Sequence, residues 1–168
     1  MGDIQTVLLS QKQIEQKINR IAYQVYEDNV EETELVIAGI VQSGFVLARK
    51  IDAVLKKISP LKTRLVEVSI DKHSHHQKEI KLSIPQSELQ GKTVILVDDV
   101  MDSGKTMIYS LKPFLQADIK KIRIAVLVDR NHKRYPVTAD FVGIRLATTM
   151  QEHITAILDE DQETVFLS

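Results

Sequence analysis

The chain has 168 residues, of which 43% are hydrophobic and 27% are charged, and its formal net charge is −1. This length suits a single domain over residues 1–168 with a sizeable core, and the ordinary composition excludes a disordered or fibrous protein. The absence of cysteine excludes a disulfide framework and thiol chemistry, and the small net charge gives no general attraction to nucleic acid.

The first third of the chain predicts a strand, a helix, a second strand and a second helix. Residues 6–9 form a short apolar run that we expect to be an edge strand. Ser10 and Gln13 have the spacing of a capping box, and apolar residues at helical spacing predict a helix that ends near Asp28. Residues 35–41 read as a buried strand, followed by a helix that ends before Pro60.

The rest of the chain continues the alternation. We expect strands at residues 65–70, 80–84, 94–97, 122–128 and 140–143, and a closing hairpin at residues 154–158 and 164–167. Pro113 should kink or shorten the helix that follows residue 104. Strands that alternate with helices predict an α/β domain with a mainly parallel central sheet flanked by helices. Since no apolar run reaches the length of a membrane span, we expect a cytoplasmic protein.

The stretch TVILVDDVMDSGKTMIY, residues 93–109, carries the strongest functional signal. An apolar strand ends at Asp98 and Asp99, and a short polar turn then leads into a helix. Unpaired N–H groups at the start of a helix suit a phosphate, and open α/β sheets bind ligands at the carboxyl ends of their strands. The turn residues that we expect to hold a phosphate are Asp102, Ser103, Gly104, Lys105 and Thr106.

Two alternatives fail on spacing. A P-loop needs a glycine where this chain has Asp99, and a receiver domain carries its paired acids much nearer its start. An ordinary buried strand with solvated acids at its end would explain a single acidic pair, but it does not explain the whole constellation. Phosphate on the turn, and hydroxyls or Mg²⁺ on the acids, together indicate a site for ribose 5-phosphate.

The segment VILVDDVMDSGKT resembles the phosphoribosyl-pyrophosphate (PRPP) motif of the type I phosphoribosyltransferases. Three further segments are similar to the bifunctional pyr-operon regulators and uracil phosphoribosyltransferases: LLSQKQIEQKINRIAYQVYEDN, AVLVDRNHKRYPVTADFVGIRL and LDEDQETVFLS. The resemblance implies the type I phosphoribosyltransferase fold, with a small hood and a C-terminal hairpin. It also implies PRPP with Mg²⁺ on the catalytic acids Asp98 and Asp99, transfer of ribose 5-phosphate to a pyrimidine such as uracil, and a homodimer or larger homo-oligomer.

The resemblance also assigns a pyrophosphate loop to Val41, Gln42, Ser43 and Gly44. A loop at the carboxyl end of a strand can offer backbone N–H groups to a diphosphate. The similar regulators usually carry arginines where this chain has Val41 and Ser43, so the charge that would neutralise the leaving group is missing here. A plain strand-to-helix turn that needs Gly44 explains the segment about equally well.

Residues 71–78 lie where these transferases have a flexible lid, and Lys72, His73 and Lys78 could then bring positive charge to the diphosphate. A solvated loop is the commonest fate of such a segment. The His-x-His-His cluster also allows a metal site, which is the weakest of the three interpretations because no carboxylate or cysteine at helical spacing supports it.

The base-binding region of the resemblance falls on Val128, Asp129, Arg130, Ile144 and Arg145. Backbone groups near residues 128–130, covered by residues 144–146, would recognise the edge of a pyrimidine. The family usually has lysine in place of Ile144 and proline in place of Ala147, so the base is not fixed by the pattern. A solvated basic loop is the alternative for residues 129–134.

Three functions remain open at this stage. The phosphate turn favours an enzyme, whereas Val41 and Ser43 favour a nucleotide-binding module without efficient turnover. The third is an RNA-binding attenuator, which is possible but disfavoured. The regulators carry threonine, arginine and histidine on a basic face of the first helix, and here only Arg20 keeps its charge.

Overall fold

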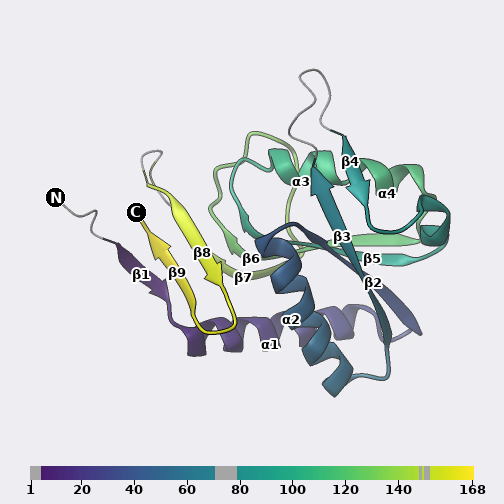
Figure 1. The fold of residues 1–168 in the computed structure, drawn as a ribbon, viewed down its shortest axis with the longest axis horizontal. Coiled ribbons are helices and arrows are strands. Elements are labelled where there is room, and N and C mark those ends of the chain that lie inside the picture. Colours follow the sequence, from purple (N-terminus) through teal and green to yellow (C-terminus); the bar gives the residue numbers. More distant parts are fainter. Residues whose placement is uncertain (1–4, 71–78, 148, 150–151) are drawn as a thin grey trace.

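The computed structural model describes residues 5–70, 79–147, 149 and 152–168. Within them the chain forms a six-stranded sheet of order β4-β3-β2-β5-β6-β7 and a separate three-stranded sheet of order β1-β9-β8 (Figure 1). Five strands of the larger sheet are parallel, and β4 runs antiparallel to β3. The mainly parallel α/β fold expected from the sequence is therefore confirmed.

The larger sheet consists of β2 (Glu34–Ile40), β3 (Lys62–Ile70), β4 (Ile80–Leu82), β5 (Thr93–Met101), β6 (Lys121–Asp129) and β7 (Phe141–Arg145). The helices are α1 (Gln11–Asp28), α2 (Ser43–Ile58), α3 (Lys105–Ser110) and α4 (Lys112–Gln116), with a 3₁₀ turn η1 (Gln86–Leu89) before β5. As Pro113 predicts, the helix after the phosphate turn breaks, here at Leu111 between α3 and α4.

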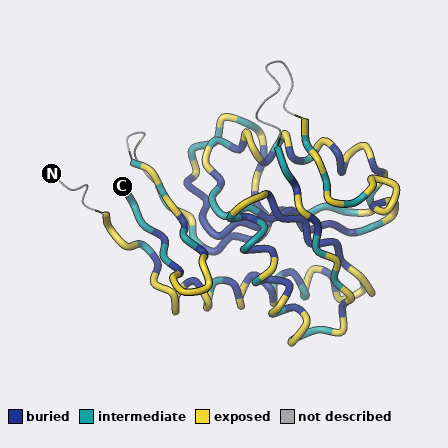
Figure 2. The backbone as a smooth tube through the Cα atoms, in the orientation of Figure 1, coloured by how far each residue is buried: buried dark blue, intermediate teal, exposed yellow. Residues whose placement is uncertain are grey.

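Each central strand is buried on both faces, which explains its nearly continuous apolar sequence (Figure 2). On β5, Ile95 and Val97 pack with α1 and α2, whereas Val94 and Leu96 pack with α3 and α4. This alternation follows from the two-residue period of a strand. The two helix layers hold the carboxyl ends of β2, β5 and β6 in one row.

The smaller sheet, which we call the hood, consists of β1 (Thr6–Leu9), β9 (Glu163–Leu167) and β8 (Ile154–Leu158). All its pairings are antiparallel, and the expected C-terminal hairpin is β8 with β9. Its inner side chains Leu9, Leu158 and Val165 join the core formed by α1 and α2. An ion pair between Lys50 of α2 and Glu163 of β9 also ties the hood to the central domain.

The first helix is fixed to the far edge of the central sheet. Arg20 donates from Nη1 to the carbonyl oxygen of Val142 over 3.2 Å and from Nη2 to that of Gly143 over 2.5 Å. The one charge that α1 shares with the basic face of the RNA-binding regulators is thus engaged with β7. None of the helices in the described part of the chain combines the length and apolar character that a membrane crossing needs.

Candidate active site

The acidic pair lies within β5 and not beyond its end. The sequence suggested that the strand stops at Asp98, but β5 continues to Met101. The reason is continued parallel pairing with β6, in which Asp98 faces Val126, Val100 faces Val128 and Met101 faces Asp129. Both acids are therefore held by sheet geometry and are only partly exposed.

The environment of Asp98 disfavours its charge. Burial raises the pKa of the Asp98 carboxyl well above its usual value of 3.8, and the neighbouring charge of Asp99 raises the pKa further. Oδ1 of Asp98 accepts a hydrogen bond from the Asp99 N–H over 2.9 Å, and Oδ1 of Asp99 accepts one from the Val100 N–H over 2.8 Å. Two adjacent carboxylates with remaining acceptor capacity fit a hydroxyl donor or a hard cation such as Mg²⁺.

The phosphate turn follows directly. Gly104 precedes α3 with φ of 84°, a left-handed conformation that favours glycine, and the Lys105 N–H donates to Ser103 Oγ over 3.2 Å. The N–H groups of Arg134 and Tyr135 donate to the Ser103 carbonyl over 2.8 and 3.1 Å, which fixes the turn from behind. A cavity of about 80 Å³ is lined by Asp98, Val100 and all residues from Met101 to Met107.

The turn between β2 and α2 lies against the acidic pair. A Cβ atom on Gly44 would lie 2.9 Å from Oδ1 of Asp98, so only glycine allows this approach. Ser43 begins α2, Gln42 precedes it, and the Val41 N–H donates to the Val68 carbonyl over 2.9 Å. The structure thus brings Gly44 of the suggested pyrophosphate loop beside Val97 and Asp98 of β5, and Val41 beside β3.

The suggested base-binding residues also come together. In the pairing of β6 with β7, Val128 faces Ile144 and Asp129 faces Arg145. Asp129 is 3% exposed, and both its carboxylate oxygens accept hydrogen bonds from Lys133 Nζ, over 3.2 and 3.1 Å. The alternative of a solvated basic loop is therefore wrong for the start of this segment, because Asp129 and Arg130 are both buried.

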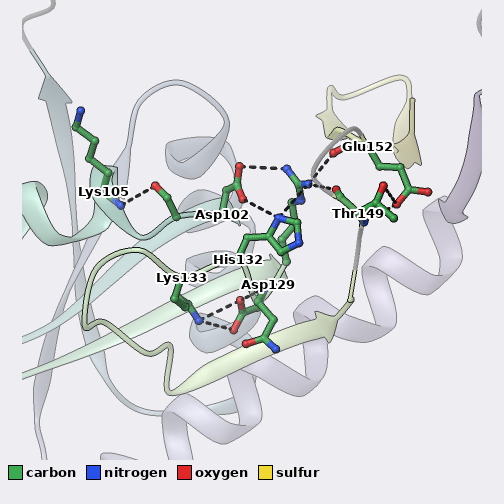
Figure 3. Close-up of polar contacts among 10 residues, drawn as sticks. Asp102, Lys105, Asp129, His132, Lys133, Thr149 and Glu152 are labelled. Carbon is green, nitrogen blue, oxygen red and sulfur yellow. Dashed lines mark hydrogen bonds and ion pairs between the residues drawn. The ribbon is translucent and has the colours of Figure 1, made fainter.

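One contact within the site was not foreseen. Arg130 Nη1 donates to Asp102 Oδ2 over 3.1 Å, so the carboxylate of the phosphate turn, labelled in Figure 3, is paired with the guanidinium of the residue that follows β6. His132 Nδ1 lies 3.9 Å from Asp102 Oδ1. No local pattern signals such a pair, since the two residues lie 28 positions apart.

A larger cavity of about 470 Å³ adjoins the phosphate turn. It extends from the turn to the start of the hood, and it is lined by Asp102, Ser103, Arg130, His132, Lys133, Arg134 and His153. The suggested lid residues Lys72, His73 and Lys78, and the histidines considered for a metal site, lie outside the described residues. Among the residues that the structure does describe, no group of three or more histidine or acidic side chains could hold a metal ion.

The chain matches a known protein family and is similar to named proteins over most of its length. The sequence pattern of the family described as "Phosphoribosyl transferase domain" matches residues 5–161. The "Bifunctional protein PyrR" of Macrococcus caseolyticus is 31% identical over 172 residues, covering 96% of this chain and 97% of that protein. The protein of the same name from Geobacter sulfurreducens is 35% identical over 162 residues, covering 92% and 91% of the two chains.

Solved structures support the same fold. The hypoxanthine phosphoribosyltransferase of Trypanosoma cruzi superposes with a TM-score of 0.80 at 18% identity, covering 97% of this chain and 91% of that one. A hypoxanthine-guanine phosphoribosyltransferase from Bacillus anthracis gives a TM-score of 0.70 at 23% identity, covering 83% and 81%. At these identities the likeness establishes the fold.

Proposed function

Because this chain belongs to the phosphoribosyl transferase domain family and is a type I phosphoribosyltransferase, we propose that it transfers ribose 5-phosphate from PRPP to a pyrimidine base, uracil first. Pyrophosphate is the leaving group. The observation that carries the proposal is the convergence of three features: the acidic pair of β5, the turn at Gly104 and the turn at Gly44. They supply sites for the hydroxyls, the 5-phosphate and the diphosphate of one ligand.

The acidic pair would hold the ribose. Asp98 and Asp99 would accept hydrogen bonds from the two ribose hydroxyls and are the residues that would hold Mg²⁺. Burial and then the charge of Asp99 raise the Asp98 pKa. A bound Mg²⁺ would offset the repulsion between the two acids and would neutralise charge on the diphosphate. Positioning and charge placement suit an oxocarbenium-like centre, so neither acid needs to remove a proton.

The 5-phosphate would be held by the turn before α3. Ser103, Gly104, Lys105 and Thr106 line the small cavity, and the backbone N–H groups there are the natural donors. Asp102 fits a different role, because its carboxylate would repel a phosphate and is paired with Arg130. We therefore assign Asp102 to the orientation of the turn and to the adjoining larger cavity.

The pyrophosphate and the base would lie at the strands on either side of β5. Val41, Gln42, Ser43 and Gly44 would cradle the pyrophosphate through their backbone. The base would lie at the ends of β6 and β7, against the backbone of residues 128–130, with Ile144 and Arg145 as its cover.

A second candidate is a PRPP-binding protein with slow turnover. It is favoured by the turn between β2 and α2, where Val41 and Ser43 bring no positive charge to the leaving group. The two candidates share the PRPP site and differ in the rate at which pyrophosphate leaves.

A product assay separates them. Radiolabelled PRPP and Mg²⁺ would be incubated with a panel of nucleobases, and nucleotide formation followed by chromatography. We expect uridine monophosphate to form fastest. Binding of PRPP without any nucleotide product would support the second candidate, and no binding of PRPP would contradict both.

A further inference from the structure

A buried arginine, Arg130, lines the larger cavity and links three parts of the molecule. Its partners Asp102, Thr149 and Glu152 are labelled in Figure 3. The side chain of Arg130 is 5% exposed, and a buried charge is tolerated only where partners compensate its desolvation. Nη1 donates to Asp102 Oδ2 over 3.1 Å. Nη2 donates to the backbone carbonyl oxygens of Thr149 and Glu152 over 3.1 and 2.6 Å.

These partners come from three separate segments. Asp102 lies in the phosphate turn after β5, and the Arg130 N–H itself donates to the Met101 carbonyl over 3.0 Å. Thr149 and Glu152 lie between β7 and β8, immediately before the hood strand. One guanidinium therefore connects the phosphate turn, the end of β6 and the entry to the hood.

The two residues whose carbonyl groups accept from Arg130 are also joined to each other by hydrogen bonds. The Glu152 carboxylate accepts hydrogen bonds from the Thr149 N–H and hydroxyl, over 2.7 and 2.9 Å. These hydrogen bonds hold the pKa of Glu152 below its usual value. Because Thr149 and Glu152 are joined by these hydrogen bonds, their two carbonyl groups present a defined target to the arginine.

The planar guanidinium holds its donors in a fixed fork, so it sets distances between its partners that a flexible cation would not. Asp102 lines the larger cavity from the phosphate turn, and His153 lines it from the start of the hood. Arg130 lines the same cavity and contacts both Asp102 and the residue before His153.

We propose that Arg130 is a positioning residue for the acceptor in the transfer reaction, an inference that rests on the proposed function. It holds the hood entry against Asp102, so that a base against the backbone of residues 128–130 is aligned with the ribose carbon that it attacks. A displacement of about 1 Å in such an alignment can cost on the order of 10²-fold in rate. The 5-phosphate donors lie in the backbone of residues 103–106, so PRPP affinity should depend much less on Arg130.

Steady-state kinetics of Arg130→Met test whether kcat depends on Arg130 while PRPP affinity does not. Arg123→Met is the matched control. Arg123 lies on β6, which ends directly before Arg130, and its Nε pairs with Asp28 Oδ2 over 3.1 Å outside the cavities described above. We expect Arg130→Met to lower kcat on the order of 10²-fold with little change in the KM for PRPP. Arg130→Lys should recover only part of kcat, because one ammonium cannot reach Asp102 and both carbonyls. Equal loss of kcat and PRPP affinity, or full recovery with lysine, would overturn the inference.

Hydrogen exchange supplies a readout that does not need turnover. In the full chain, Arg130→Met and Asp102→Asn should each speed amide exchange in β8 (Ile154–Leu158) but not in α2. The double variant should exchange no faster than Arg130→Met alone. If Arg130→Met does not fold, Arg130→Lys and Asp102→Asn carry both measurements.

The role of Arg130 and the transferase activity can be contradicted separately. Unchanged exchange in β8 would overturn the role of Arg130 and leave the transferase proposal standing. A wild-type protein that forms no nucleotide would overturn the transferase proposal, whereas faster exchange in the variants would still establish the link between hood and phosphate turn.

Discussion

At the scale of single residues, electrostatic repulsion and burial of the acidic pair destabilise the unliganded protein. Asp98 and Asp99 carry like charges on adjacent positions of one strand, and burial disfavours the charge of Asp98 further. Such destabilisation is expected at a binding site, where a bound cation or hydroxyl donors compensate it. The pair therefore lowers stability in the unliganded protein and should be compensated on binding.

Asp98→Asn should raise the melting temperature at neutral pH. The folded pKa of Asp98 lies above its unfolded value of about 3.8, so the native state binds more protons between the two values. Stability falls as pH rises through that window, and the full cost persists above the folded pKa. The gain from asparagine should therefore vanish as pH falls toward 3.8, as thermal unfolding at several pH values would show.

Asp28→Asn is the opposite control. Burial raises the pKa of Asp28, but hydrogen bonds and charges from Lys121 and Arg123 outweigh it, and the net pKa lies below 3.8. The charged form is thus stabilising at neutral pH, and asparagine should lower the melting temperature there. A stabilising Asp28→Asn, or a destabilising Asp98→Asn, would contradict this electrostatic account.

The phosphate turn gives an ordered set of variants. Ser103→Ala should weaken binding of ribose 5-phosphate by about 1.5–3 kcal/mol, the value of one hydrogen bond to a charged group. Gly104→Val should do more harm, because φ is positive there and a Cβ atom would lie 2.5 Å from Val137 Cγ1. Lys105→Ala should cost least. Calorimetric titration that ranks Lys105→Ala as the most damaging would show that a point charge holds the phosphate.

At the scale of elements, the structure confirms the capping box that the sequence predicts at the start of α1. The Gln13 N–H donates to Ser10 Oγ over 3.4 Å, and the Ser10 N–H donates to Gln13 Oε1 over 2.9 Å. This box closes the junction between hood strand β1 and α1. A three-residue spacing was enough to predict it, because both partners lie in one turn.

Ser10→Ala should lower the free energy of unfolding by about 0.5–2 kcal/mol, the usual cost of losing an N-cap. Gln16→Ala on the exposed face of α1 is the control and should change it little. Urea unfolding of both variants measures the difference. Equal stabilities for the two would mean that the cap does not hold the helix start.

The turn between β2 and α2 tests whether missing positive charge limits turnover. Placing arginine at Val41 and Ser43 would bring charge to the departing pyrophosphate and should raise kcat on the order of 10-fold. Val41 is 37% exposed, so a longer side chain there has access to solvent. Val30→Arg, at a position that is 59% exposed and lies before β2, is the control that adds the same charge as either single substitution. A kcat unchanged by the double substitution would exclude missing charge as the limit.

At the scale of the whole molecule, the sequence predicted what local periodicity determines. The strands of the central sheet, the break at Pro113 and the closing hairpin follow from patterns within a few residues. The extension of β5 to Met101 was missed because it depends on pairing with β6. The Arg130 link and the Arg20 contacts with β7 were missed because their partners are distant in sequence and mostly backbone carbonyls.

The most direct test of the proposed function is titration of PRPP, in the presence of Mg²⁺, into the wild type and into the double variant Asp98→Asn with Asp99→Asn. We predict that the wild type binds PRPP in a magnesium-dependent manner. The double variant should lose that binding while its melting temperature is not lowered, because the removed charges destabilise the free protein. Unchanged PRPP affinity in a folded double variant would contradict the assignment of β5 as the ribose and metal site.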